Sequence, residues 1–222
     1  MLSREELAKM IDSTNVKATA TKNEIEKLCK EAAEYGFRCA VVNPVYVKLA
    51  ASTLKDSSVK VCSTVGFPVG VSLPEIKALE AVKAVEDGAE ELDMVINLSA
   101  MKSGDYETVK QDIAAVVDVK RLSKDIIVKV IIETTFLTKE EKIIACKLSK
   151  EAGADFVKTS TGLFGKGATV EDVKLMRQTV GKDMGVKAAG RIRTYADAIA
   201  MIEAGANRIG TSTAAQIIQE AP

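Results

Sequence analysis

Three lysines lie within apolar segments of this sequence, where a charged side chain is unusual. Lys129 is flanked on both sides by valine and isoleucine, and Lys158 and Lys187 each end a short apolar run. A buried ammonium group loses much of its hydration energy unless it is paired or its pKa shifts. A desolvated lysine crowded by other cations becomes a partly neutral amine, which attacks carbonyls and forms a Schiff base. These positions therefore indicate imine chemistry.

The absence of histidine narrows the remaining chemistry. The chain has no histidine, which excludes the Ser-His-Asp triad, the Cys-His pair and the usual zinc ligand sets. Acid-base work must then fall to lysine, carboxylate, tyrosine, cysteine or water. The cysteines Cys29, Cys39, Cys62 and Cys146 form no C-x-x-C pair, so we expect buried reduced thiols in a cytoplasmic protein. No metal and no cofactor are expected.

Composition excludes several other classes of protein. The chain has 222 residues, 47% of them hydrophobic, with 31 basic and 31 acidic side chains. The balanced charge gives no indication of a nucleic-acid partner. No apolar run approaches the roughly 18 residues that cross a membrane, and the N-terminus lacks an apolar signal core. We expect a single domain, residues 1–222, with no membrane partner.

Short β-branched runs alternate with longer amphipathic stretches along the whole chain. The alternation predicts eight strands and six main helices, most of the strands too apolar to be exposed on either face. The predicted strands are 10–14, 39–43, 59–65, 92–97, 126–133, 156–160, 185–189 and 208–211. The predicted helices are 23–35, 73–87, 106–123, 139–152, 170–180 and 194–204.

Eight strand–helix units in one domain of this length favour a closed barrel. Three helices end in similar turns, with Gly88, Gly153 and Gly205 in positions suited to a left-handed residue. We therefore predict an α/β fold, a single-domain (β/α)8 TIM barrel with a short N-terminal helix. A doubly wound open sheet is the alternative, but Asn43-Pro44 is not the glycine-rich turn that such a sheet places after an early strand.

The barrel prediction brings the lysines together. Alternate residues of a strand share a face, and strand C-terminal ends line the active site of a barrel. If these faces point inward, Lys129, Lys158 and Lys187 converge with Asp93, whose face also carries Glu91. The alternative is that each lysine extends to solvent at a strand end.

Two further groups of polar residues follow predicted strands. Asp12 and Thr14 end the first strand, where they either bind a lysine head group or cap the next segment. Glycines and hydroxyls follow the sixth, seventh and eighth strands, and this combination suits a phosphate site, although it is also common in ordinary turns. The candidate phosphate residues are Thr161, Gly162, Gly190, Gly210, Thr211, Ser212 and Thr213.

Seven segments, in order and spanning nearly the whole chain, resemble the deoxyribose-phosphate aldolases. They are residues 11–14, 42–44, 65–68, 92–97, 128–134, 157–162 and 186–188. The resemblance implies a (β/α)8 barrel and a class I aldolase that needs neither metal nor cofactor. It also implies reversible cleavage of 2-deoxy-D-ribose 5-phosphate to acetaldehyde and D-glyceraldehyde 3-phosphate, within deoxyribonucleotide catabolism.

The resemblance also implies individual roles. Lys158 matches the Schiff-base lysine, Lys187 the lysine that lowers its pKa, and Asp93 the carboxylate that relays protons through water. Asp12 and Thr14 match a supporting pair, and Lys129 a further pocket lysine. Thr161 matches a hydroxyl that contacts the substrate, and the phosphate cradle matches Gly162, Gly190, Ser212 and Thr213.

The sequence departs from the family pattern at three places. Ser13 stands where many members have histidine, and Arg191 stands where a second glycine is usual. We expect Arg191 at the phosphate end of the pocket. The chain also ends without the tyrosine that members commonly carry, so we expect turnover rate rather than reaction type to differ.

Two other functions are also compatible with the sequence. One is a class I aldolase or lyase acting on a keto acid, which would need a carboxylate site near Lys158. The other is a sugar-phosphate-binding barrel without catalysis, which would form no borohydride-trapped adduct with acetaldehyde. In either case the expected partners are small sugar phosphates and aldehydes, and the sequence is compatible with a homodimer or a higher homo-oligomer.

Overall fold

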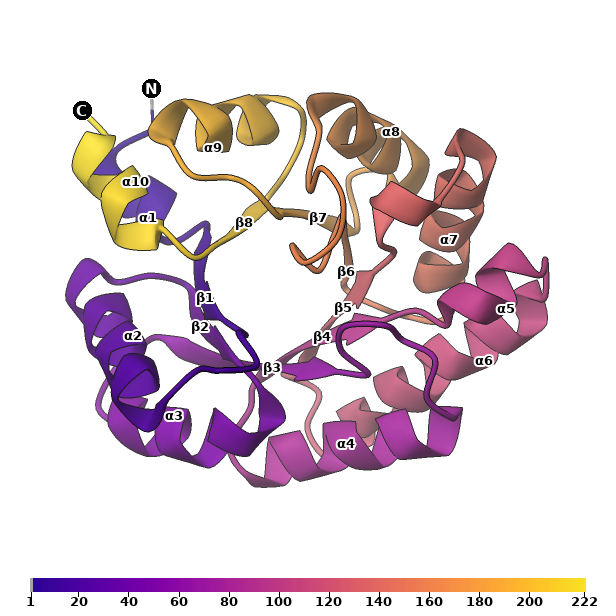
Figure 1. The fold of residues 1–222 in the computed structure, drawn as a ribbon, viewed down its shortest axis with the longest axis horizontal. Coiled ribbons are helices and arrows are strands. Elements are labelled where there is room, and N and C mark those ends of the chain that lie inside the picture. Colours follow the sequence, from indigo (N-terminus) through magenta and orange to yellow (C-terminus); the bar gives the residue numbers. More distant parts are fainter. Residues whose placement is uncertain (1) are drawn as a thin grey trace.

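The computed structural model describes residues 2–222; Met1, the first residue of the expected domain, lies outside the described residues. Within them, eight parallel strands hydrogen-bond in chain order from β1 to β8 and close into a barrel (Figure 1). This confirms the predicted (β/α)8 architecture. The strands are β1 (Ile11–Asn15), β2 (Cys39–Val42), β3 (Lys60–Val65), β4 (Glu91–Val95), β5 (Ile127–Ile131), β6 (Phe156–Lys158), β7 (Gly185–Ala189) and β8 (Arg208–Thr211).

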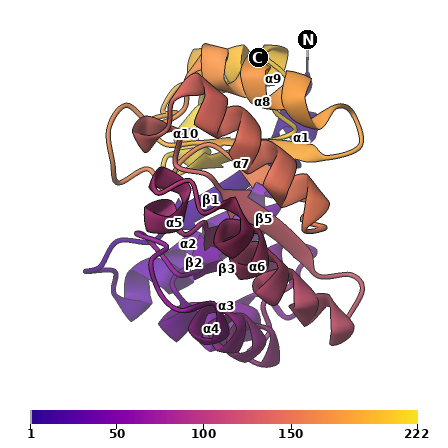
Figure 2. The same ribbon diagram turned by 90° about the vertical axis from the view of Figure 1, so that its right-hand side faces the viewer.

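The helices form a ring outside the barrel, as both ribbon views show (Figures 1 and 2). None of the helices in residues 2–222 combines the length and hydropathy needed to cross a bilayer. Short 3₁₀ turns cover Pro44–Tyr46, Asp118–Arg121 and Thr134–Phe136. The helices are α1 (Arg4–Ala8), α2 (Lys22–Tyr35), α3 (Val47–Leu54), α4 (Pro74–Glu86), α5 (Leu98–Lys102), α6 (Tyr106–Val117), α7 (Lys139–Glu151), α8 (Val170–Val180), α9 (Tyr195–Glu203) and α10 (Ala214–Glu220).

Local sequence signals explain where several helices begin and end. Thr21 caps α2 by accepting the backbone N–H of Glu24, and the Glu24 carboxylate accepts the backbone N–H of Thr21 in return. Thr138 and Glu141 repeat this reciprocal arrangement at the start of α7. Gly36 ends α2 at φ 65°, a left-handed conformation that glycine adopts without a Cβ penalty.

The structure corrects several predicted boundaries. The strand predicted for residues 126–133 ends at Ile131, because Glu133 takes a left-handed φ of 52° and turns the chain. The strand predicted to reach Ser160 ends at Lys158. The helix predicted for 106–123 ends at Val117 and continues as a 3₁₀ turn. Helices α3, α5 and α10 were not predicted, since each is eight residues or shorter and offers little periodicity.

The main hydrophobic core lies between the strands and the helices rather than inside the barrel. Cys39, Val41 and Cys62 form a separate, much smaller apolar cluster. A barrel interior is usually filled by bulky branched residues. Here small residues leave space for long polar side chains: a Cβ on Gly210 would approach Lys187 Cε to 3.0 Å. Long charged side chains therefore occupy much of the barrel interior.

Candidate active site

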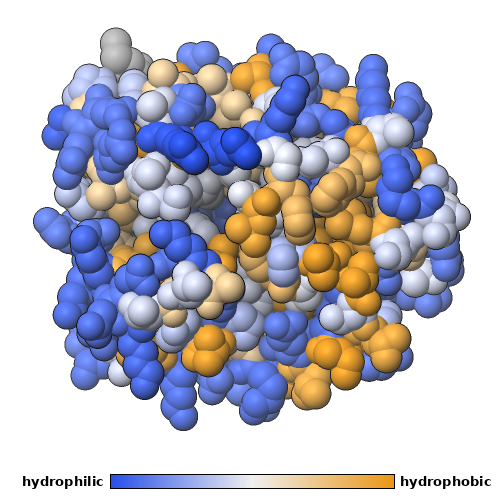
Figure 3. All heavy atoms as spheres, viewed as in Figure 1, coloured by the Kyte–Doolittle hydropathy of each residue, from blue (hydrophilic) through white to orange (hydrophobic). Residues whose placement is uncertain are grey.

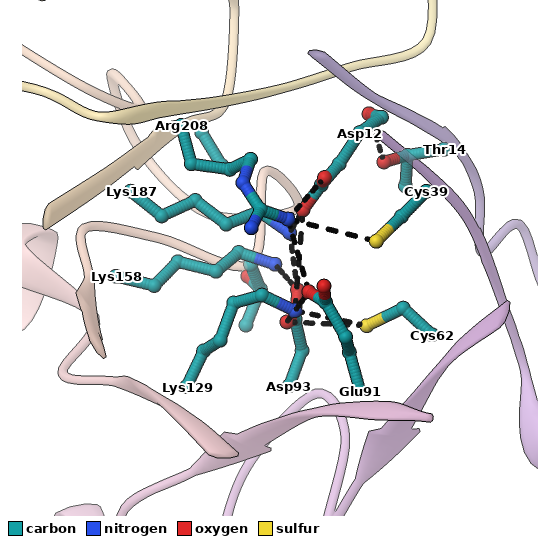
Figure 4. Close-up of polar contacts among 12 residues, drawn as sticks. Asp12, Thr14, Cys39, Cys62, Glu91, Asp93, Lys129, Lys158, Lys187 and Arg208 are labelled. Carbon is teal, nitrogen blue, oxygen red and sulfur yellow. Dashed lines mark hydrogen bonds and ion pairs between the residues drawn. The ribbon is translucent and has the colours of Figure 1, made fainter. Parts of the chain in front are cut away.

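Seven charged side chains meet inside the barrel, and we call them the buried charge cluster (Figure 4). Each belongs to a strand, and each is at most 5% exposed. Strand register sets them side by side: Asp93 pairs with Lys129, Lys158 with Lys187, and Lys187 with Arg208. The members are Asp12, Glu91, Asp93, Lys129, Lys158, Lys187 and Arg208.

Asp93 is the centre of the buried charge cluster. Its Oδ2 lies 2.7 Å from the Nζ atoms of both Lys158 and Lys187, and its Oδ1 lies 2.9 Å from Lys129 Nζ. The thiol of Cys62 donates to Oδ1 at 3.3 Å. Burial alone would raise the pKa of Asp93, but the three ammonium groups hold it well below its usual range. Asp93 is therefore a carboxylate at neutral pH.

The three lysines differ in how many carboxylates they reach. Lys129 Nζ lies 2.7 Å from Glu91 as well as 2.9 Å from Asp93, and Lys187 Nζ contacts both Asp12 and Asp93. Burial opposes charge on both, yet these carboxylates raise the pKa of Lys129 well above its ordinary value and also raise that of Lys187.

Lys158 is the exception among the three lysines. It reaches only Asp93, and it shares that oxygen with Lys187. Burial lowers its pKa, Asp93 partly offsets this, and the Lys187 ammonium lowers it further. Lys158 is therefore the lysine of the cluster that gives up its proton most easily.

Charge balance within the cluster explains the same result. Three carboxylates face four cations among the described residues of the barrel interior. One cation is in excess in a medium where uncompensated charge is costly. Loss of a proton from Lys158 makes the cluster neutral, which is why burial lowers the pKa of this lysine.

Arg208 holds the carboxylates on the far side of the cluster. Its Nη1 donates to Asp12 at 2.8 Å and to Glu91 at 2.9 Å, and lies 3.5 Å from Cys39 Sγ. Its guanidinium also lies 5.2 Å from the ring centroid of Phe156. Asp12, Cys39 and Glu91 are the group within residues 2–222 whose spacing suits a metal ion. A guanidinium occupies the centre of that group and supplies its positive charge.

A cavity of about 480 Å³ opens above the buried charge cluster. Of the seven cluster residues, all within the described chain, Lys158 alone lines it. The amine with the lowered pKa is thus the one that an entering molecule can reach. Thr14, Thr161, Gly162, Gly190, Arg191 and Ser212 also line the cavity.

The loops after β6 and β7 pack against each other at one end of this cavity. A Cβ on Gly190 would lie 3.2 Å from Gly162 Cα, so both loops depend on glycine there. Arg191 is exposed and takes a left-handed φ of 62°, which costs a non-glycine residue of order 1 kcal/mol. The backbone thus keeps the shape that a glycine would adopt, while a cation is placed at the rim.

Two residues named from the sequence do not contact the reacting groups. Thr14 donates to the backbone carbonyl of Asp12 at 3.0 Å rather than to a lysine or a carboxylate, although it lines the cavity. Thr213 is absent from the described cavity lining, and its hydroxyl donates to the backbone carbonyl of Arg193. Ser212, its neighbour, does line the cavity.

Four residues at the site had no role predicted from the sequence. Strand parity placed Glu91 on the same face of β4 as Asp93, but no role was assigned to it. Arg208 precedes Gly210 on the same face of β8, a similar signal. Nothing in the local sequence indicated that Cys62 would contact Asp93 or that Glu133 would bind Thr161.

The surface around the opening is uneven in character. Figure 3 shows apolar side chains gathered on one side of this face and charged side chains on the other. Exposed apolar residues occur in the loops after β3, β5 and β6, among them Val69, Val71, Phe136 and Leu163. Besides Lys158, the charged residues that line the cavity are Lys17, Lys27, Arg191 and Arg193 and the carboxylates Glu24 and Glu31. Positive side chains thus border the same cavity as Lys158.

Known proteins resemble this chain closely. A family model described as DeoC/LacD family aldolase matches residues 7–220. Deoxyribose-phosphate aldolases from Methanothermobacter thermautotrophicus and Thermococcus kodakarensis are 62% and 60% identical, covering 98% and 100% of this chain and 96% and 99% of the relatives. A solved structure described as the unique tetrameric structure of deoxyribose phosphate aldolase from Aeropyrum pernix is 39% identical, with a TM-score of 0.91 over 98% of this chain and 91% of that one.

The cluster geometry makes a prediction about stability. Replacing Arg208 by methionine should lower the free energy of unfolding by about 3–5 kcal/mol, because Asp12 and Glu91 lose a buried counter-charge. Arg38→Met is the matched control: Arg38 also contacts Glu91, at 3.4 Å, but its side chain is 41% exposed, so its loss should cost under about 1 kcal/mol. Urea unfolding at neutral pH measures both. Equal losses would contradict the assignment of Arg208 as the clamp.

Proposed function

The chain belongs to the DeoC/LacD family of aldolases, and on this basis we propose that it cleaves 2-deoxy-D-ribose 5-phosphate reversibly to acetaldehyde and D-glyceraldehyde 3-phosphate. The observation that carries the proposal is the position of Lys158. It is the cluster amine that lines the cavity, and burial and Lys187 lower its pKa. The names of the relatives at about 60% identity support the choice of substrate.

The first step is imine formation on Lys158. Its neutral amine adds to the C1 aldehyde of the open-chain sugar, and the resulting carbinolamine loses water to give an iminium. The iminium restores the positive charge that the amine had lost. Asp93, 2.7 Å from the Lys158 nitrogen, stabilises that charge because it remains ionised.

The second step breaks the bond between C2 and C3. The C3 hydroxyl loses its proton to a water molecule that passes it to the Asp93 and Lys187 pair, the C2–C3 electrons move into the iminium, and glyceraldehyde 3-phosphate leaves. The remaining enamine takes a proton at C2, and hydrolysis releases acetaldehyde and regenerates Lys158. The iminium is the electron sink throughout, and synthesis runs the same steps in reverse.

The phosphate is bound at the end of the cavity formed by the loops after β6, β7 and β8. Gly162 and Gly190 keep their backbone close to the cavity, and Ser212 adds a hydroxyl. Arg191 and Arg193 add positive charge at the same end. This cationic end also suits the carboxylate of a keto acid, but the names of the relatives favour the sugar phosphate.

The setting of the enzyme is also a proposal. We infer a cytoplasmic, homo-oligomeric enzyme. The four cysteines are all buried and free, which suits a reducing compartment. The relative from Aeropyrum pernix is described as tetrameric, and Leu73, Ile76 and Leu79 on and beside α4 are each more than half exposed.

Lys158 should be the residue that carries the adduct. Acetaldehyde followed by borohydride should add one ethyl group to the intact protein, and peptide mapping should place it on Lys158. Lys158→Met should abolish the adduct and the cleavage activity, whereas Lys142→Met, which removes a lysine paired with Asp172 on the helices, should retain both. An adduct on Lys187 or Lys129 would overturn the assignment, and no adduct at all would favour a binding protein.

Lys187 should set the pH at which the imine forms. Its ammonium lowers the pKa of Lys158, so Lys187→Leu removes that repulsion and leaves Asp93 to Lys158. The pKa of Lys158 then rises, and a higher pH is needed to populate the neutral amine. The lower limb of the pH profile for adduct formation should move upward by about one unit or more. A limb that stays in place would show that the two lysines are not coupled.

Arg191 should contribute to preference for the phosphorylated sugar. Arg191→Gly and Arg191→Asn both remove the charge, and both residues tolerate the left-handed backbone. Each should lower the ratio of kcat/KM for 2-deoxyribose 5-phosphate over 2-deoxyribose by about tenfold, the value of one charge-assisted hydrogen bond. An unchanged ratio in both variants would place Arg191 in solvent. A higher ratio in Arg191→Gly alone would mean that closer backbone approach matters more than the charge.

A further inference from the structure

Glu133 is a buried carboxylate that lies outside the buried charge cluster. Glu133 lies two residues after the end of β5 and is fully buried. Its backbone is left-handed, with φ 52° and ψ 70°. Among residues 2–222, Glu133 and Arg191 are the two non-glycine residues with a positive φ. Strained backbone of this kind persists where the surroundings impose it, and it is concentrated at functional sites. The two residues flank β6, which carries Lys158.

This backbone conformation places the Glu133 carboxyl group against Thr161, a residue that lines the cavity. Glu133 Oε2 accepts the backbone N–H of Thr161 at 2.9 Å and the Thr161 hydroxyl at 2.6 Å. Oε1 has no hydrogen-bond donor within the described residues. The carboxylate therefore acts on Thr161, and Thr161 lines the cavity that holds Lys158.

The surrounding segments hold this pair rigidly. The Thr134 N–H donates to the carbonyl of Thr159 at 2.9 Å, and the Phe136 and Phe164 rings lie 5.3 Å apart. A Cβ on Gly165 would overlap Thr135 at 2.2 Å, so the loop after β6 lies directly on the segment that follows Glu133. The Thr161 hydroxyl consequently has a fixed position.

The polarity of that hydroxyl is fixed as well. Glu133 Oε2 already accepts the Thr161 N–H, and the Thr161 hydroxyl donates its one proton to the same oxygen. The Leu163 N–H donates to Thr161 Oγ1 at 3.3 Å, which leaves one lone pair of the oxygen for the cavity. Thr161 can then accept from a ligand but cannot donate to it. A carbonyl or aldehyde oxygen, which needs a donor, is not a partner for it.

We propose that Glu133 is a positioning residue that fixes Thr161 as a hydrogen-bond acceptor, so that the site selects aldehydes carrying a hydroxyl group beside the carbonyl. The proposal rests on the aldolase activity proposed above. In the synthetic direction the selected group is the C2 hydroxyl of D-glyceraldehyde 3-phosphate. In 2-deoxyribose 5-phosphate the same group is the C4 hydroxyl.

The test compares two acceptor aldehydes in the reaction with acetaldehyde. D-Glyceraldehyde 3-phosphate carries the hydroxyl, and 3-phosphooxypropanal lacks it. The wild-type ratio of their kcat/KM values should favour the hydroxylated aldehyde by about tenfold, the value of one good hydrogen bond. Glu133→Leu should bring this ratio close to one, because the Thr161 hydroxyl loses the acceptor that holds its proton away from the cavity. Glu133→Gln should keep the ratio, because its amide oxygen can accept from both Thr161 donors in place of Oε2. The borohydride-trapped acetaldehyde adduct on Lys158 should keep its wild-type yield.

Control variants separate selection from folding. Glu141→Leu makes the same change at a carboxylate that caps α7, and it should leave the ratio unchanged. Thr161→Val should lose the preference and Thr161→Ser should keep it, and these two decide the matter if Glu133→Leu does not fold. An equal fall for both aldehydes in Glu133→Leu, or an unchanged ratio in Thr161→Val, would overturn the proposal. Wild-type protein that forms no acetaldehyde adduct would overturn the aldolase activity and this inference with it.

Discussion

One carboxylate oxygen shared by two ammonium groups governs the chemistry of this barrel. Asp93 Oδ2 lies 2.7 Å from both Lys158 and Lys187, and the cluster around it holds four cations against three carboxylates. Lys129 and Lys187 are each satisfied by two or more acids, so the excess charge falls on Lys158. In the low dielectric of the interior this excess positive charge is unfavourable, and loss of the Lys158 proton would remove it. The pKa of Lys158 is lowered for this reason. The lowered pKa of Lys158 follows from the balance of charge rather than from a dedicated base.

The fold has to support such an interior from outside. A barrel whose centre is charged gains little from its own lumen, so stability must come from the core between strands and helices. That core contains nearly all of the buried aliphatic residues, whereas the lumen contributes a small cluster of Cys39, Val41 and Cys62. Burying ion pairs is at best weakly stabilising. The two regions therefore have different roles, since the outer layer stabilises the barrel and the inner layer sets the pKa values.

The loops around the cavity opening also combine a packed backbone with charged side chains. The β6 strand is only three residues long and ends at Lys158, so the loop after it begins beside the amine that lines the cavity. Glu133 and Arg191, the two described non-glycine residues with positive φ, stand on the segments to either side. One directs a carboxylate inward to Thr161, and the other keeps a glycine-like turn while presenting a cation. The strain is tolerated because packing on both segments over-determines the backbone.

The architecture and the kind of chemistry could be predicted from the amino-acid sequence. Alternating strand and helix patterns predicted the barrel, because each element is specified by local periodicity and caps. Lysines within apolar strands, together with the absence of histidine, indicated imine chemistry, and strand parity indicated that Lys129, Lys158, Lys187 and Asp93 could meet.

Contacts between distant segments could not be predicted in this way, because they depend on distances that only the folded chain defines. Cys62 donates to Asp93, and Glu133 reaches Thr161 across 28 residues. The identity of the lysine whose pKa falls belongs to the same class. It depends on how many carboxylates each ammonium reaches, and the order of residues along the chain does not record this.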